Sequence, residues 1–265
     1  MRHINSLTNP VIKSLRALHD RKRRRQSGQF LAEGTRIVTE ALELGWAPDT
    51  LVFLEGREDD PMVKRLIRQA EASGADIIMV SAAVLAKISR KDNPQMVMAS
   101  FDERWSDAEQ AFTADDGVWV VLDRVRDPGN LGTILRTADA VGARGVMLVG
   151  ECCDGFSVEA VRASMGAMFN IPMAQMTEAE FTARAASYKG EILGTALPAS
   201  VDYRTPHWQG PMMLLMGNEQ AGLTDGLMAA ATQLIRMPML GRSDSLNLAV
   251  ATGVALYEYL RHQPQ

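Results

Sequence analysis

The sequence has few cysteines and no long apolar segment. Its only two cysteines, Cys152 and Cys153, are neighbours, so they cannot join distant parts of the fold through a disulfide. No apolar run approaches the roughly 20 residues that a membrane-spanning helix needs, and residues 1–6 contain no apolar signal region. Hydrophobic residues make up 46% of the chain and charged residues 23%, which is typical of a globular protein. We therefore expect a cytoplasmic protein that does not insert into a membrane.

Two kinds of functional site also lack their usual residues. The four histidines, at positions 3, 19, 207 and 262, are scattered, and neither cysteine has a partner at metal-ligand spacing, so we expect no metal site. In residues 123–138 only Gly129 and Gly132 lie close together and no Lys follows them, so neither GxGxxG nor GxxxxGK[ST] occurs. This pattern disfavours a nucleotide-dependent oxidoreductase and a P-loop enzyme.

The positive charge is concentrated at one end of the chain. Residues 1–36 contain nine Lys or Arg and two acidic residues, whereas the rest of the chain contains 19 basic and 30 acidic residues. Clustered cations favour contact with phosphate groups, because neutralised phosphates release their counterions. We therefore predict that the basic run binds RNA. Its members are Arg21, Lys22, Arg23, Arg24 and Arg25. A solvated linker, or a helix end whose cations interact with the helix dipole, is the alternative for this run.

Hydrophobic periodicity predicts two α/β domains. Helix-like and strand-like apolar segments alternate up to residue 101, which predicts a small layered domain over residues 1–101. Residues 102–116 are acidic and weakly periodic, so we expect a linker there. A second domain is predicted over residues 117–265. Its strands are apolar throughout and separated by helices, which indicates a parallel sheet covered on both faces.

Three polar segments follow predicted strands of the second domain, where ligands of open α/β sheets usually bind. The first contains Asp127-Pro128-Gly129-Asn130-Leu131-Gly132 and continues into a helix that carries Arg136 away from its apolar face. A guanidinium near a helix start suits a phosphate group, although a salt bridge to Asp139 would also explain it. The second is Gly217-Asn218-Glu219. Gly217 would let a ligand approach the backbone or would simply form a turn.

The third segment runs from Met237-Pro238-Met239 to Ser245-Leu246-Asn247 and leads into the last predicted helix. Ser245 is expected to cap that helix, whereas capping does not account for Asn247.

These three segments, in this order, resemble the signature of the SpoU (TrmH) branch of the SPOUT RNA methyltransferases. The resemblance covers residues 117–262. Residues 1–101, with Phe30-Leu31-Ala32-Glu33-Gly34 and Asn93-Pro94-Gln95, resemble the substrate-binding domain of the ribosomal-RNA members.

The resemblance implies transfer of a methyl group from S-adenosylmethionine to a ribose 2′-hydroxyl of RNA. It also implies a deep trefoil knot in the parallel sheet and a homodimer with active sites at the subunit interface. The implied catalytic residues are Asn130, Arg136, Glu219, Ser245 and Asn247. The implied cofactor-binding residues are Gly217, Met237 and Leu246, with Met237 in place of the isoleucine common in the family.

A sulfonium methyl group is already electrophilic, so the protein has to align it with the 2′-oxygen and promote loss of the hydroxyl proton. Arg136 stays protonated far above neutral pH. We therefore expect it to bind the adjacent phosphate and stabilise the developing alkoxide, while Asn130 and Glu219 position the ribose and Arg136. Ribosomal RNA of the large subunit is the expected substrate, because the transfer-RNA members typically lack the extra domain. A transfer-RNA methyltransferase and a non-catalytic RNA-binding protein are the alternatives.

Overall fold

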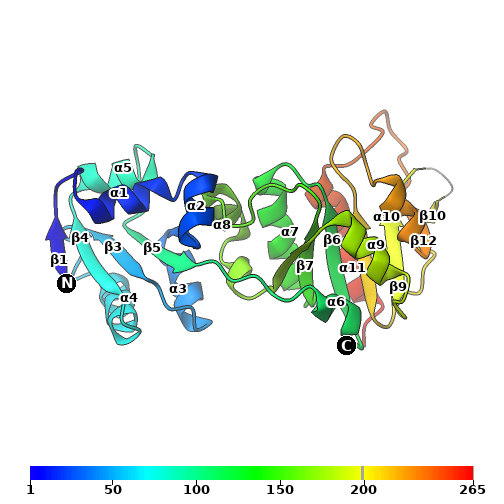
Figure 1. Ribbon diagram of the computed structural model, residues 1–265, viewed down its shortest axis with the longest axis horizontal. Helices are drawn as coiled ribbons and strands as arrows, with labels where there is room; N and C mark the ends of the chain where they lie inside the picture. The colour runs from blue at the N-terminus through cyan, green and yellow to red at the C-terminus, as the bar shows by residue number, and fades with distance from the viewer. Residues whose placement is uncertain (198–199, 265) are drawn as a thin grey trace. The chain divides into compact units, whose positions relative to one another are not determined.

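The computed structural model describes residues 1–197 and 200–264, and the chain forms two compact units (Figure 1). Unit 1 comprises Met1–Arg104 and Asp154–Asn170, and unit 2 comprises Trp105–Cys153 and Ile171–Gln265. The expected boundaries differ from this division in two places. Residues 154–170, which the sequence assigned to the second domain, belong to unit 1, and residues 105–116 of the expected linker belong to unit 2.

Unit 1 contains a five-stranded mixed sheet in the order β1-β4-β3-β5-β2. Strand β5 runs antiparallel to β2 and β3, and the other pairs are parallel. The strands are β1 (Arg2–Ile4), β2 (Gln29–Glu33), β3 (Thr50–Leu54), β4 (Asp76–Val80) and β5 (Val97–Asp102). The helices are α1 (Pro10–Ala17), α2 (Arg21–Ser27), α3 (Thr35–Glu43), α4 (Pro61–Ala72), α5 (Ala82–Ser89), α8 (Val158–Ser164) and the 3-10 helix η1 (Ala167–Phe169).

Helix α1 shows how the local sequence builds unit 1. The Asn9 side chain accepts a hydrogen bond from the Val11 amide at 2.9 Å, and Pro10 occupies the first helical position, where no amide donor is needed. Ile12, Leu15 and the following Leu18 recur at helical spacing and are buried. They pack in one core with side chains of α5 and the sheet, among them Val52, Ile78, Val80, Val84, Leu85, Ile88 and Met98.

The segment 154–170 is anchored in unit 1 by aromatic and ionic contacts. Phe156 and Phe169 pack against Phe30 with ring centroids 4.9 and 6.0 Å apart, and the Trp46 indole donates a hydrogen bond to the Phe169 carbonyl at 2.9 Å. Helix α8 ends at Ser164, because Met165 and Gly166 have left-handed backbone conformations with φ of 54° and 103°.

The buried carboxylate of Glu33, at the end of β2, collects donors from three parts of unit 1. It accepts hydrogen bonds from the Ser89 hydroxyl at 2.7 Å, the Gln95 amide at 3.1 Å and the Arg162 guanidinium at 2.6 Å. Burial opposes ionisation, but these hydrogen bonds outweigh it and hold the pKa of Glu33 below its ordinary value. Glu33 therefore ties α8 to the end of α5 and to the loop before β5.

Unit 2 contains a seven-stranded sheet in the order β10-β12-β9-β11-β6-β7-β8, and every neighbouring pair is parallel. This confirms the α/β class and the parallel sheet. The strands are β6 (Val118–Asp123), β7 (Gly145–Val149), β8 (Met173–Met176), β9 (Glu191–Thr195), β10 (Val201–Asp202), β11 (Met212–Met216) and β12 (Gln233–Arg236). The helices are α6 (Glu109–Thr113), α7 (Pro128–Ala140), α9 (Glu178–Ala185), α10 (Asp225–Ala230) and α11 (Leu248–Arg261).

Both faces of this sheet are covered, which explains why its central strands lack polar alternation. Trp119 and Val121 of β6 pack in one core with Ala111 of α6, Phe181 of α9 and Leu227 of α10. The alternate side chains of β6 and β7 are also buried, α7 contacts β7, and α11 packs along α7. The trefoil knot stays a prediction. Within the described residues, no helix has the length and hydropathy required to cross a bilayer.

Candidate active site

The three predicted segments follow β6, β11 and β12, and their loops meet at the carboxyl edge of the parallel sheet. Strand β11 lies directly between β6 and β9, and β12 pairs with the other side of β9. Because parallel strands end at the same edge, loops from distant parts of the sequence come together there.

Hydrogen bonds join one residue from each of the three segments. The Asn130 side-chain amide donates to Glu219 Oε1 at 3.2 Å, and Asn130 Oδ1 accepts from the Asn247 side chain at 3.0 Å. The Glu219 carboxylate also accepts from the backbone amides of Arg126 and Asp127, each at 3.3 Å. The structure therefore brings together three of the five predicted catalytic residues, with Asn130 as the bridge between the other two.

The last helix is capped by a different residue from the one expected. The prediction that Ser245 caps α11 is wrong, because Asn247 is the N-cap, and its Oδ1 accepts from the amides of Ala249 at 2.9 Å and Val250 at 3.3 Å. The Ser245 hydroxyl instead donates to Asp244 at 3.3 Å. Asn247 thus uses its oxygen to begin α11 and its nitrogen to bind Asn130.

The loop after β11 is a tight turn that requires glycine at its start. A Cβ on Gly217 would lie 2.4 Å from the backbone of Gly222 and Leu223, which favours the turn interpretation of this glycine. Asn218 fixes the turn. Its Oδ1 accepts from the amides of Gln220 and Ala221 at 3.0 Å, and its Nδ2 donates to the Arg124 carbonyl at 2.8 Å.

A cavity of about 580 Å³ lies beside this network, within the range typical of small-molecule sites. It is lined by all three predicted cofactor-binding residues, Gly217, Met237 and Leu246, and by three predicted catalytic residues, Glu219, Ser245 and Asn247. Apolar side chains that include Met216, Ile235, Met239 and Leu248 form part of its wall, and Tyr203, Arg236 and Asp244 add polar groups.

Arg136 stands apart from the other predicted residues. It lies on α7 with an exposed side chain, it does not line the cavity, and within residues 1–197 and 200–264 its guanidinium forms no hydrogen bond or ion pair. The alternative of a salt bridge to Asp139 is therefore not observed. The guanidinium remains available for an external anion.

Two further residues, Asp127 and Asn218, support the site, although neither was among the predicted catalytic or cofactor-binding residues. Asp127 is the N-cap of α7 and accepts from the Asn130 amide at 2.9 Å. Its position directly before Pro128 is a recognisable signal for a helix start. Asn218 holds the turn after β11 through local hydrogen bonds to Gln220 and Ala221, which are typical of Asn in turns, whereas its bond to the Arg124 carbonyl, 94 residues away, has no local signal.

The basic run forms helix α2 of unit 1, and one of its members is buried. The prediction that Arg24 contacts RNA is wrong, because its side chain is only 4% exposed. Its Nε and Nη2 donate to Asp154 at 3.1 and 2.7 Å, and it also donates to the Leu18 carbonyl. The remaining four members, Arg21, Lys22, Arg23 and Arg25, are exposed.

Comparison with known proteins identifies both parts of the chain. The SpoU rRNA Methylase family matches residues 117–257, and the MRM3-like substrate binding domain matches residues 9–99. The chain belongs to the SpoU methylase family. This assignment agrees with the position of the hydrogen-bonded network, since Asn130, Glu219 and Asn247 all fall within the matched range.

Relatives of this SpoU methylase extend over nearly its whole length. A crystal structure of an AdoMet-bound rRNA methyltransferase from Sinorhizobium meliloti is 45% identical, covers 99% of this chain and 98% of its own, and superposes with a TM-score of 0.92. The 23S rRNA (uridine(2479)-2'-O)-methyltransferase of Streptomyces viridochromogenes is 30% identical over 93% of this chain and 87% of its own. The 23S rRNA (guanosine(2553)-2'-O)-methyltransferase RlmP of Bacillus subtilis is 29% identical over 97% of this chain and 98% of its own.

Proposed function

We propose that this protein transfers a methyl group from S-adenosylmethionine to a ribose 2′-hydroxyl of large-subunit ribosomal RNA. The observation that carries the proposal is the bridge from Glu219 through Asn130 to Asn247 beside the 580 Å³ cavity. The named 23S rRNA 2'-O-methyltransferases among its relatives support the reaction and the substrate.

The cavity fits S-adenosylmethionine. Its apolar wall suits the adenine ring and the methionine carbon chain, and the carboxylates of Glu219 and Asp244 suit a ligand that carries ammonium and sulfonium charges. Gly217 and Met237 would hold the cofactor from the ends of β11 and β12, and Leu246 would hold it from the loop before α11. When bound, it supplies an electrophilic methyl group.

The residues of the chain then have separate roles. Glu219 holds the loop before α7 through the amides of Arg126 and Asp127, and Asn130 locks that loop to the start of α11. Arg136 follows on α7, and its guanidinium carries a positive charge that suits a phosphate. It therefore binds the phosphate next to the target ribose and stabilises the negative charge that develops on the 2′-oxygen. Ser245 lines the cavity, where its hydroxyl can contact the ribose.

The decisive experiment measures transfer of labelled methyl groups to deproteinised ribosomal RNA and, in parallel, to transfer RNA, followed by nucleoside analysis. We expect a 2′-O-methylnucleoside in the ribosomal fraction. Modification of transfer RNA alone would favour the transfer-RNA alternative. Binding of S-adenosylmethionine without transfer to either RNA would favour a non-catalytic role.

Arg136→Ala tests the assignment of the activating group. We expect transfer to fall at least about 100-fold, as for the loss of one oxyanion-stabilising donor, while cofactor affinity stays within a few-fold. Arg184→Ala, which removes an exposed arginine on α9 of the same unit, is the control. Loss of cofactor binding by Arg136→Ala would contradict the assignment.

A homodimer is also part of the proposal. Helix α11 and the residue two positions before it expose an apolar stripe formed by Leu246, Val250, Val254 and Tyr257, which are 36–56% exposed. An exposed apolar stripe of this kind favours a protein interface. Sedimentation equilibrium should give twice the chain mass of 29.0 kDa, and a mass of one chain would contradict the dimer. A cytoplasmic location is inferred from the proposed substrate.

A further inference from the structure

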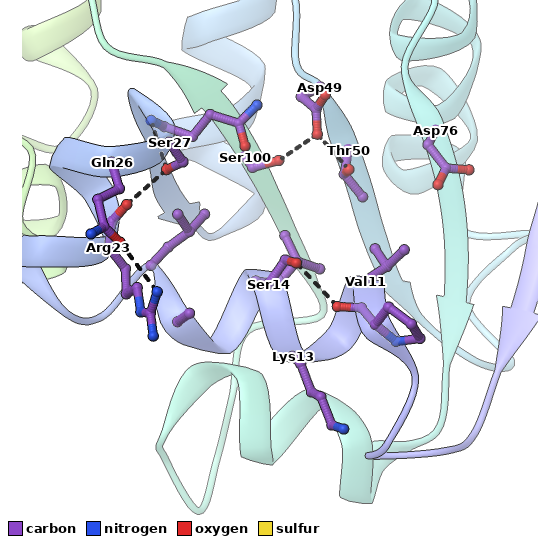
Figure 2. Close-up of a pocket in the computed structure, with 15 residues that line it drawn as sticks. Val11, Lys13, Ser14, Arg23, Gln26, Ser27, Asp49, Thr50, Asp76 and Ser100 are labelled. Carbon is purple, nitrogen blue, oxygen red and sulfur yellow. Dashed lines mark hydrogen bonds between the residues drawn. The ribbon is translucent and has the colours of Figure 1, made fainter.

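Unit 1 contains a second cavity, of about 870 Å³, between helices α1 and α2 and the ends of β3, β4 and β5 (Figure 2). The helices supply an apolar wall that includes Val11, Leu15 and Leu18. The strands supply polar groups from Asp49, Thr50, Asp76 and Ser100. A site with one apolar wall and one polar edge suits a flat heterocycle rather than a chain of phosphates.

The polar edge is held in place by the sheet. Thr50 and Ser100 are direct partners in the pairing of β3 with β5, and both are at least 95% buried. The Thr50 hydroxyl donates to Asp49 Oδ2 at 2.9 Å, and the Ser100 hydroxyl reaches the same oxygen at 3.5 Å (Figure 2). The Asp49 backbone is fixed on both sides, because its amide donates to Ser100 and its carbonyl accepts from Asp76, each at 2.9 Å. The carboxylate of Asp49 is thus oriented by its neighbours.

Asp49 also differs in charge from the other acidic residue of the cavity. Asp76 is paired with the Arg2 guanidinium, which contacts both of its carboxylate oxygens. Among the described residues, Asp49 has no ion-pair partner, and its Oδ1 accepts no hydrogen bond. Lys13 on α1 and Arg23 on α2 also line the cavity and supply positive charge on the helix side. A ligand that fits this arrangement presents N–H donors to Asp49 and phosphate to the helices.

We propose that this cavity binds an unpaired guanine nucleotide of the RNA substrate, at a site separate from the methyl-transfer site. The proposal rests on the proposed function, because it takes RNA as the ligand. An ionised carboxylate only accepts hydrogen bonds. Guanine offers it two adjacent donors, N1–H and the 2-amino group, whereas adenine, cytosine and uracil each place an acceptor beside the donor on the same edge. Unpaired bases are commonly recognised by such edge contacts.

The base identity can be tested by a change of specificity. Saturation-transfer NMR titrations of the full-length protein with 5′-GMP, 5′-AMP and 5′-XMP should show a preference for GMP. In Asp49→Asn, one acceptor becomes a donor, so GMP affinity should fall at least about tenfold, the loss expected when a hydrogen bond to a charged group is removed. XMP, which carries a carbonyl in place of the 2-amino group, should bind Asp49→Asn better than the unmodified protein. A purely structural defect would not produce this gain.

Two further variants make the result decisive. Asp59→Asn, a 93% exposed carboxylate of unit 1 outside the cavity, should bind the nucleotides unchanged. Ser14→Phe introduces a large side chain on the cavity wall of α1 and should abolish GMP binding without affecting S-adenosylmethionine. Equal binding of GMP and AMP, or GMP binding that survives both Asp49→Asn and Ser14→Phe, would overturn the proposal. Absence of methyl transfer by the unmodified protein would refute the proposed function instead, and would leave the nucleotide titrations interpretable.

Discussion

Replacing Arg24 with glutamine should destabilise unit 1 and have little direct effect on RNA affinity. The guanidinium makes two hydrogen bonds to Asp154 and one to the Leu18 carbonyl, so the variant leaves a largely buried carboxylate without its main partner. Removing one partner of a buried ion pair costs about 3–5 kcal/mol. Asp154 keeps the Phe156 amide at 2.9 Å and has Arg21 at 4.0 Å. We therefore expect a loss near the lower end of that range, about 3 kcal/mol.

The matched control is Arg25→Gln, which changes the neighbouring, exposed arginine of the same helix. It should leave stability within about 0.5 kcal/mol. If Arg25 contacts a phosphate, the plot of log RNA affinity against log salt concentration should become less steep, its negative slope shrinking in magnitude by about 0.7. That is the contribution of one phosphate contact in single-stranded nucleic acid. Because the two units need not unfold together, hydrogen exchange in the β2 segment, measured across a urea series, is the assay specific to unit 1.

The outcome that would refute this reasoning is the reverse pattern. Arg24→Gln could leave the amide hydrogen exchange of β2 unchanged and weaken the salt dependence of RNA affinity as Arg25→Gln does. In that case the Arg24–Asp154 pair would not stabilise unit 1. The double variant Arg24→Gln with Asp154→Asn provides a second check. It removes both charges, so it should lose less stability than the two single variants added together.

Two other changes test contacts that the structure shows. Asn247→Ala removes the cap of α11 and the hydrogen bond to Asn130, so the free energy of unfolding, measured by denaturant titration, should fall by about 1 kcal/mol or more. Ser245→Ala should change the free energy of unfolding by less than about 0.5 kcal/mol. Equal losses in the two variants would contradict the assignment of Asn247 as the cap. Glu33 has a lowered pKa in the folded chain, so its stabilising contribution is present above the unfolded value of 4.5 and is lost as the pH falls through the lower folded value. Glu33→Gln should therefore be less stable than the unmodified protein at pH 7, and its free energy of unfolding should fall less steeply below pH 4.5. If the free energy of unfolding of the two proteins had the same dependence on pH, the stabilising role of this carboxylate would be contradicted.

The parallel sheet of unit 2 was predictable because a strand buried on both faces is a continuous run of apolar residues in the sequence. Strands β6 and β11 are apolar at almost every position, whereas a strand with one face in solvent would alternate apolar and polar residues. Shorter elements gave weaker signals. Strand β8 has two exposed or half-buried residues among four, and the two-residue β10 has no pattern of its own. Helix α9 begins with a capping box of Thr177 and Glu180, a local signal that hydrophobic periodicity alone does not contain.

Side-chain roles were harder to predict, because they depend on partners that are distant in the sequence. The five basic residues of α2 are chemically similar, yet Asp20 caps the helix and Gly28 ends it, and that register turns Arg24 inward toward Asp154, 130 residues away. Ser245 and Asn247 were both assigned to catalysis, and Ser245 alone was expected to cap the last helix, although a helix N-cap of either type would fit the local sequence. The choice is made by Asn130, which binds the nitrogen of Asn247 from a different loop and so fixes where α11 begins. Charge and residue type therefore locate the candidate surfaces, whereas the long-range contacts decide which side chains remain free to meet a ligand.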